Sequence, residues 1–234
     1  MDQKLLPKLI AEIKKFSNPE RAKVSGWFFK TGKGDYGYGD KFIGLTVPLQ
    51  RKIADKFVDI SLKDLGKLLK SDIHEHRFIA LEILVMKYEK GLENKKKIID
   101  FYLKNTKHIN NWDLVDTSAP YIMGNFLLNR PKNILYKLAQ SKNIWERRIA
   151  IVSTLEFIRN NKFSDTIKIS KILLKDSHDL IHKAVGWALR EMGKKNEKML
   201  VGFLNQYYKK MPRTALRYSI ERLSEKQTKF YMKR

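Results

Sequence analysis

The feature of this sequence that most limits its fold is an apolar repeat at helical spacing, which recurs along nearly the whole chain. Apolar side chains fall three or four positions apart, as at Phe78, Leu81, Val85 and Tyr88. No alternating apolar–polar run is long enough to predict a β-sheet. The pattern therefore predicts an all-α protein, with later helices near 74–89, 94–105, 111–128, 131–140, 143–159, 164–174, 178–192, 197–208 and 212–223.

Helix-start signals divide the first part of the chain. Asn18 followed by Pro19 predicts an N-cap and the first turn of a helix that runs through Phe29. Pro48 and Ser61 mark the starts of two more helices. Residues 31–44 hold five of the chain's 12 glycines and are expected to form a loop. Because this segment lacks a GxGxxG pattern and follows a helix, the sequence gives it no role in binding phosphate.

The spacing of the expected helices indicates how they pack. Connections of about 2–6 residues are typical of helical hairpins, and the pairs recur about every 35–40 residues in pattern rather than in sequence. An up-down bundle seldom needs so many short helices. We therefore expect an α-solenoid of HEAT-like helical hairpin repeats. Nothing in the composition marks a boundary, so residues 1–234 are expected to form one domain.

The charge balance indicates the kind of partner. Lys and Arg number 48 against 25 Asp and Glu, a net charge of +23, which favours a polyanion through counterion release. A generally basic proteome or an anionic membrane surface is the alternative explanation. Residues 196–234 hold ten basic and three acidic residues, and Arg213 and Arg217 share a helical face that could grip phosphates. A basic concave face of the solenoid would follow a duplex.

Several classes of protein are excluded by what the sequence lacks. It has no cysteine and no apolar run of 18 residues, so we expect neither a cysteine-ligated metal nor a transmembrane helix. It has no HExxH, P-loop or GxSxG motif. His178 and His182 are spaced as metal ligands can be, but no third ligand is near them in sequence, so no metal is expected. The absence of a secretory signal predicts a cytoplasmic protein, associated with the nucleoid if bacterial.

The segment NNWDLVD (110–116) holds the first candidate functional residues. Trp112 and Asp116 are four positions apart, which places the indole and the carboxylate on one helical face. Asp113 lies one step round the helix and can serve as a first-turn acid or cap. Each residue also has a simpler explanation, because tryptophans usually belong to cores and aspartates are often solvated.

Two further segments combine tryptophan with basic residues. In IHKAVGWALRE (181–191), Lys183, Trp187 and Arg190 share one face. Gly186 interrupts that helix, which a close approach of another helix or of a ligand would explain. In NIWERRIAI (143–151), Arg148 could pair with Asp116 and hold the carboxylate ionised, although two solvated arginines are an equally good explanation.

These three segments, in this order, resemble the AlkD-type DNA alkylation-repair glycosylases, which are built from HEAT-like repeats. The resemblance runs from NPERA (18–22) to the basic C-terminal helices and includes KTGKGDYGYGDKFIGLTVP (30–48). It implies that Asp116 is the catalytic aspartate and that Trp112 and Trp187 contact the lesion and its deoxyribose. It also implies that the following residues contact DNA: Arg148, Arg190, Lys183, Arg213, Arg217, and Phe28 or Trp27.

The sequence departs from the family pattern at one aligned position. A family tyrosine near the end of the second helix aligns with Phe28, or with Trp27 one position off, so a hydroxyl is missing there.

The resemblance also implies a chemistry. A purine alkylated at N3 or N7 is cationic and leaves as a neutral base, so a fixed carboxylate can stabilise the developing sugar cation without a strong general acid. The implied partner is double-stranded DNA with alkylated bases. The implied enzyme is a monomer that needs no cofactor and no metal.

Two other functions stay open at this point. A non-catalytic DNA-binding protein of the same fold would keep the basic surface but not the catalytic aspartate, which this chain has at Asp116. A helical-repeat scaffold for an acidic protein would bind without DNA, and it would leave the Trp–Asp–Arg–Trp set without an explanation.

Overall fold

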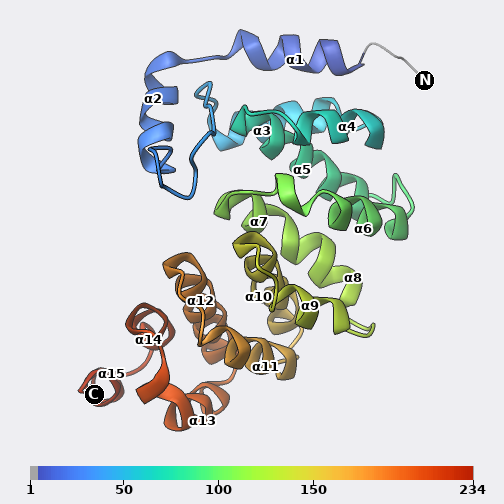
Figure 1. Cartoon of the computed structure of the whole chain (residues 1–234). Coiled ribbons are helices and arrows are strands. Elements are labelled where there is room, and N and C mark those ends of the chain that lie inside the picture. Colours follow the sequence, from blue (N-terminus) through green and yellow to red (C-terminus); the bar gives the residue numbers. More distant parts are fainter. Residues whose placement is uncertain (1–4, 234) are drawn as a thin grey trace. The chain divides into compact units, whose positions relative to one another are not determined.

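The structure is a computed structural model that describes residues 5–233, and within that range every regular element is a helix (Figure 1). One isolated bridge, between Lys41 and Ile73, pairs two loop segments. The prediction of an all-α protein is confirmed, and the helices that pack on their neighbours along the chain are consistent with an α-solenoid of helical repeats. The chain divides into two compact units, Met1–Ser118 and Ala119–Arg234, so the prediction of one domain stays a prediction.

The first unit is built around one buried helix, α5. Its helices are α1 (Leu5–Lys15), α2 (Pro19–Phe28), α3 (Val47–Lys56), α4 (Leu62–Leu69), α5 (His74–Glu89), α6 (Lys95–Lys104), the short 3₁₀ helix η1 (Thr106–His108) and α7 (Trp112–Ala119). Helix α5 packs against α3, α4 and α6, which buries almost all of its side chains. Its first turn is polar and nevertheless buried, so those polar groups must be paired within the unit.

The predicted helix starts of the first unit are confirmed. Asn18 accepts a hydrogen bond from the Arg21 backbone N–H at 2.9 Å, and Ser61 accepts one from the Asp64 N–H at 3.2 Å. Each bond satisfies a backbone donor that has no partner inside its helix. None of the side chains of helix α2 is fully buried.

The second unit is organised around α10 and α12. Its elements are the π-helical turn η2 (Pro120–Gly124), α8 (Asn125–Leu127), α9 (Asn133–Leu138), α10 (Ile144–Arg159), α11 (Ser164–Leu173), α12 (Asp179–Lys195), α13 (Glu197–Tyr207), the 3₁₀ helix η3 (Tyr208–Lys210), α14 (Arg213–Ile220) and α15 (Glu225–Met232). Helix α10 packs against η2, α9, α11 and α12, and α12 packs against α13 and α14. Of the helix expected over 111–128, residues 112–127 are helical, with a π turn that starts at Pro120, which has no N–H to donate.

A close approach of two helices explains Gly186. A Cβ atom at this position of α12 would lie 2.4 Å from the Cβ of Tyr218 and 2.6 Å from the carbonyl oxygen of Ala215, both on α14. Only glycine leaves room for this contact, although it weakens a helix by about 1 kcal/mol relative to alanine. Of the two explanations for Gly186, helix packing is therefore the one that the structure supports.

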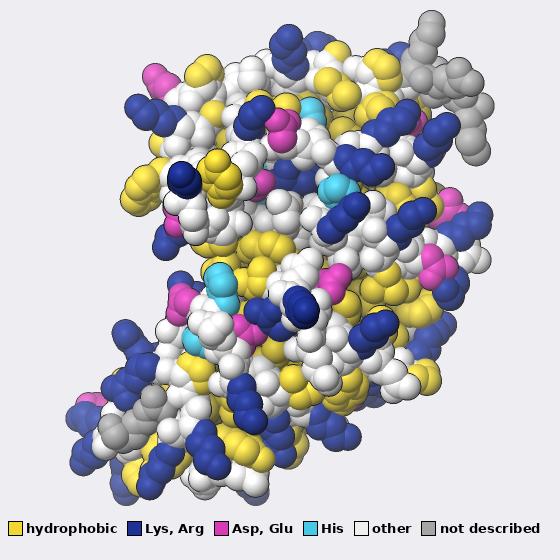
Figure 2. All heavy atoms as spheres, viewed as in Figure 1, with side chains coloured by type: hydrophobic (Ala, Val, Ile, Leu, Met, Phe, Trp, Pro, Cys, Tyr) yellow, Lys and Arg dark blue, Asp and Glu magenta, His cyan; other side chains and the backbone are white. Residues whose placement is uncertain are grey.

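The surface carries basic side chains over both units. Figure 2 shows Lys and Arg spread over the face in view, with many of them around the C-terminal helices. The basic concave face stays a prediction. Within residues 5–233, no helix is both long and apolar enough to cross a lipid bilayer.

Candidate functional site

Helix α7 carries Trp112 and Asp116 one turn apart, and both side chains are half-buried. The Asn111 side-chain oxygen accepts the Trp112 backbone N–H at 2.8 Å, which gives a partner to one of the free backbone donors of the first turn. Burial raises the pKa of the Tyr102 phenol, and the nearby Asp116 charge adds to this effect although a hydrogen bond to Ser118 opposes it. The Tyr102 hydroxyl lies 2.9 Å from Ser118 Oγ and stays protonated.

An aromatic cluster holds the Trp112 indole. The ring of Phe29 stacks on it with centroids 5.3 Å apart, and Phe28 meets it edge-on at 6.0 Å. The indole N–H donates to the hydroxyl of Tyr36, 3.3 Å away. Of the two residues that align with the family tyrosine, Phe28 is therefore the one that contacts Trp112, whereas Trp27 is 82% exposed. The hydroxyl beside Trp112 comes from Tyr36, which lies in the segment of residues 31–44. We call this segment the glycine-rich loop.

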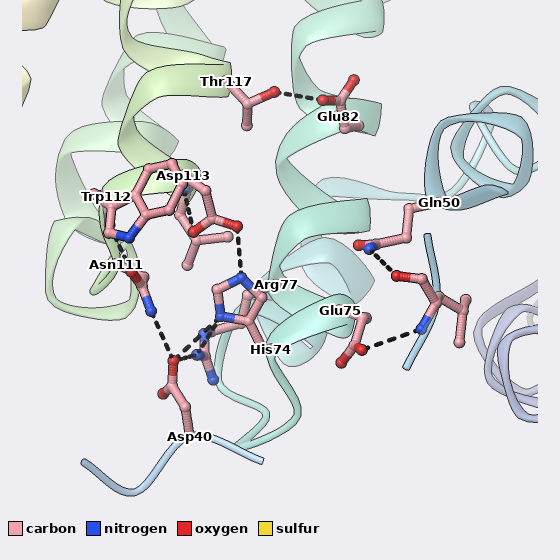
Figure 3. Close-up of polar contacts among 12 residues, drawn as sticks. Asp40, Gln50, His74, Glu75, Arg77, Glu82, Asn111, Trp112, Asp113 and Thr117 are labelled. Carbon is pink, nitrogen blue, oxygen red and sulfur yellow. Dashed lines mark hydrogen bonds and ion pairs between the residues drawn. The ribbon is translucent and has the colours of Figure 1, made fainter. Parts of the chain in front are cut away.

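A buried ionic cluster ties the same loop to the start of α7 (Figure 3). His74, in the first turn of α5, lies with Nε2 at 2.7 Å from Asp113 Oδ2 and with Nδ1 at 3.2 Å from Asp40 Oδ2. Arg77 Nη2 lies 2.7 Å from the same Asp40 oxygen, and the Asn111 side-chain N–H donates to it at 3.4 Å. We call these five residues the His74 cluster. Sequence reasoning treated Asp113 as a first-turn acid and did not identify His74, Asp40 or Arg77.

The His74 cluster is a set of charges that stabilise one another. Burial alone would lower the pKa of His74, but the charge of Asp113 and hydrogen bonds to Asp113 and Asp40 raise it to about 9. Burial would likewise raise the pKa of Asp40, yet the hydrogen bond to His74 and the charge of Arg77 keep it below its usual value. Two cations and two carboxylates thus face each other near pH 7, and their opposite charges offset the cost of burying them.

A second carboxylate fixes the end of the glycine-rich loop. Glu75 is buried and accepts the backbone N–H groups of Ile43, Gly44 and Leu45 at 3.1, 2.7 and 3.3 Å. Gly44 has a φ of +83°, and a Cβ there would lie 2.2 Å from the carbonyl oxygen of Asn18. The loop that the sequence left without a role therefore packs on α5 and reaches Trp112.

The predicted phosphate-gripping residues of the second unit line one cavity. Lys183, Arg213 and Arg217 surround a space of about 500 Å³ between α12 and α14, together with Asp179 and Glu221. Lys183 Nζ lies 2.9 Å from Asp179 Oδ2. Arg213 donates to the carbonyl oxygen of Met232 at 3.2 Å.

Arg190 is held by two carboxylates of the same unit. Its Nη1 contacts a carboxylate oxygen of Glu221, and its Nε donates to Glu191 at 3.3 Å. A phosphate that approaches Arg190 has to compete with these carboxylates for the guanidinium.

Trp187 and Arg148 lie at separate points of the second unit. Trp187 is half-buried and lines a cavity of about 450 Å³ that also holds the basic side chains of Arg159 and Lys194. The buried Arg148 donates from Nη1 to the carbonyl oxygen of Leu180 at 2.7 Å. Its pairing with Asp116 stays a prediction.

Of the two histidines at metal-like spacing, His178 caps a helix and His182 contacts the turn before it. His178 accepts the Leu180 backbone N–H at 3.1 Å at the start of α12, and His182 Nε2 lies 2.6 Å from the carbonyl oxygen of Asp176. Within the described range, no group of three or more His, Asp or Glu side chains is arranged to hold a metal ion.

Comparisons with known proteins agree with this picture of the chain. A family model for DNA alkylation repair enzymes matches residues 9–223. A solved structure, described as a predicted DNA alkylation repair enzyme from Enterococcus faecalis, shares the fold with a TM-score of 0.72 and 17% sequence identity, over 89% of this chain and 97% of that one. No curated protein matches the chain. Because the family model covers most of the sequence, the chain belongs to the DNA alkylation repair enzyme family.

Proposed function

We propose that this protein is a DNA glycosylase that hydrolyses the N-glycosidic bond of cationic N3- or N7-alkylated purines in duplex DNA and leaves an abasic site. The observation that carries the proposal is the pairing of Trp112 and Asp116 one turn apart on α7. The first turn of that helix is held by the His74 cluster, so the indole and the carboxylate project from a rigid element.

These groups suit the departure of a charged base. An alkylated purine carries the positive charge before the bond breaks, and the charge moves to the sugar as the neutral base leaves. The carboxylate of Asp116 would stabilise the oxocarbenium-like sugar and position the attacking water. The π face of Trp112 would attract the cationic base by roughly 0.5–2 kcal/mol. The base leaves without a strong general acid, unlike the leaving group of an ordinary glycosidase.

The remaining residues are proposed to bind DNA rather than to act on the bond. Trp187 would contact the lesion or its deoxyribose, as the family resemblance implies. The basic groups would contact phosphates, which position the duplex without reading its sequence; they are Arg148, Lys183, Arg190, Arg213 and Arg217. Phe28 would support Trp112, and Trp27 would meet the DNA surface. The enzyme would work as a cytoplasmic monomer, without a metal or cofactor.

Base release from a duplex that contains N7-methylguanine tests the proposal. Wild type should release the base, and Asp116→Asn should be slower by about 10²–10³-fold, as when one preorganised electrostatic partner is removed. Asp100→Asn is the matched control because it makes the same change of charge at an exposed carboxylate that faces Lys96 on α6. Duplex binding is measured for every variant.

The outcomes separate catalysis from binding. Slow release by Asp116→Asn with binding retained supports the carboxylate mechanism. Tight, salt-sensitive binding with no release by wild type would instead indicate a DNA-binding protein of the same fold without activity on this lesion.

A further inference from the structure

A small cavity in the first unit is lined by Arg77 and by Asp40, two members of the His74 cluster. It measures about 230 Å³ and is formed by the turn between α4 and α5, by η1 and by the glycine-rich loop. Lys70, Arg77, Lys107, His108 and Asn110 are among the residues that line it. The proposed chemistry at Trp112 and Asp116 uses none of these five side chains directly.

Three polar atoms at this cavity lack hydrogen-bond partners among the described residues. They are Arg77 Nε, His108 Nε2 and Asn110 Oδ1, and all three are buried. Arg77 uses its other nitrogens, because Nη1 donates to the Ser71 carbonyl oxygen and Nη2 faces Asp40, each at 2.7 Å. Buried polar groups are nearly always paired in native proteins, so three orphan atoms around one cavity point to an external partner.

The charge at the cavity is positive. Lys70, Lys107 and Arg77 contribute cations. Two acidic residues also line it, but Asp40 faces His74 and Arg77, and Asp72 lies 2.6 Å from Lys41. Both carboxylates are therefore already neutralised by a neighbouring cation, and the cavity retains an excess of positive charge.

The pKa of His108 reflects the positive charge around the cavity. Burial lowers the pKa of His108, and the charges of Lys107, Lys70 and Arg77 lower it further. The imidazole is consequently neutral at pH 7 while the cavity is empty. An anion in the cavity would reverse the balance and favour the imidazolium, which donates from both ring nitrogens.

We propose that this cavity binds a phosphate group, with Arg77 Nε, His108 Nε2 and the ammonium groups of Lys70 and Lys107 as donors. The Asn110 carboxamide faces the same group and can offer its amino group after a 180° rotation. The phosphate comes from the backbone of bound DNA or from a free phosphate ion. The DNA source rests on the proposed function, whereas the free ion does not.

The test follows the His108 imidazole of the full chain by NMR during pH titrations. Separate samples contain no addition, inorganic phosphate, or an undamaged DNA duplex. The pKa of His108 should rise with at least one addition. A rise with the duplex alone, or with both, supports a backbone phosphate, and a rise with inorganic phosphate alone supports a site for the free ion. A pKa that changes with neither addition overturns the proposal.

A pair of double variants distinguishes loss of this site from loss of the same total charge elsewhere. Lys70→Met with Lys107→Met removes two cations from the cavity, and Lys63→Met with Lys104→Met removes two from the same part of the fold outside it. If the phosphate is that of DNA, the cavity variant should lower the slope of log K against log salt by about 0.9, one phosphate contact, and should abolish the His108 response. Equal losses in both double variants would contradict a specific site. Base release is measured on the same proteins, so a failed phosphate site is not confused with an inactive enzyme.

Discussion

The imidazole Nε2 of His74 lies 2.7 Å from the Oδ2 of Asp113, and this contact joins the first turn of α5 to the first turn of α7. Asp113 directly follows Trp112 and precedes Asp116 by three positions. The position of the proposed catalytic helix therefore depends on an ion pair whose imidazole is nearly inaccessible to water, since His74 is only 2% exposed.

The first prediction concerns the pH dependence of stability. Because the folded-state pKa of His74 is raised to about 9, its contribution is fully present below its unfolded value, near 6.5, and is lost as pH rises through 9. The shift corresponds to about 3 kcal/mol. The unfolding free energy of wild type should therefore fall towards that of His74→Gln between pH 6.5 and pH 9, as measured by urea unfolding. The Asp40 contribution has the opposite sign and disappears only in acid, because its folded pKa is lowered.

His76→Gln is the matched control for that experiment. Burial lowers the pKa of His76, so its contribution is present above about 6.5 and is lost as pH falls. Its difference from wild type should change only in acid. A His74→Gln difference that stays constant from pH 6 to pH 10 would contradict an imidazolium at His74.

The second prediction isolates the hydroxyl beside Trp112. Tyr36→Phe removes the acceptor of the indole N–H and leaves the ring. A lost hydrogen bond of about 1 kcal/mol corresponds to about a fivefold slower base release if the indole moves. Single-turnover release measures this effect, and Tyr38→Phe is the control because it changes a neighbouring tyrosine that is 66% exposed. An unchanged rate in Tyr36→Phe would show that the hydroxyl does not position Trp112.

The third prediction concerns the carboxylate that holds Arg190. Glu221→Gln removes one of the two carboxylates that hold the guanidinium, so a phosphate competes more easily for it, and duplex affinity should rise with a steeper salt dependence. Glu225→Gln makes the same change of charge on α15, where Glu225 faces Lys229. Fluorescence anisotropy at several salt concentrations compares the two variants. An equal gain in both would mean that net charge alone is responsible.

The fourth prediction tests the close packing of α12 on α14. Gly186→Ala places a methyl group within 2.4 Å of Tyr218 Cβ and should destabilise the fold by about 1–3 kcal/mol. Gly202→Ala, on α13, meets nothing within 4 Å and should stabilise by up to about 1 kcal/mol. Thermal unfolding of the two variants should therefore shift in opposite directions. Stabilisation by both variants would show that α14 moves to make room for the methyl group at position 186.

The helices were predictable because their signals are local. Asn18 and Ser61 cap helices through bonds to residues three positions away, and the apolar period of α5 appears directly in the sequence. Helix α15 was not predicted, although the capping box between Ser224 and Gln227 is a local signal, because Tyr231 alone of its side chains is buried and no apolar stripe marks the helix. The π turn at Pro120 was missed because its neighbours continue the helical pattern on both sides.

The candidate site was predictable only where it lies along one helix. Trp112 and Asp116 were identified from their spacing, which fixes their common face. Their supports come from distant segments, because Asp40 and Asp113 are 34 and 39 positions from His74. No periodicity reveals which polar residues will be buried together. Phe28 and Trp27 could not be told apart for the same reason, since one position changes which ring turns toward Trp112.

The glycine-rich loop limits how this protein can be re-engineered. The Tyr36 hydroxyl accepts the Trp112 indole N–H, and the Asp40 carboxylate contacts the His74 imidazole. An insertion between Tyr36 and Asp40 would change the spacing of these two contacts and displace one of them. Nothing lies within 4 Å of the position that a Cβ of Gly34 would occupy. An insertion at Gly34 lies outside the segment between Tyr36 and Asp40, so it would keep the spacing of these two contacts.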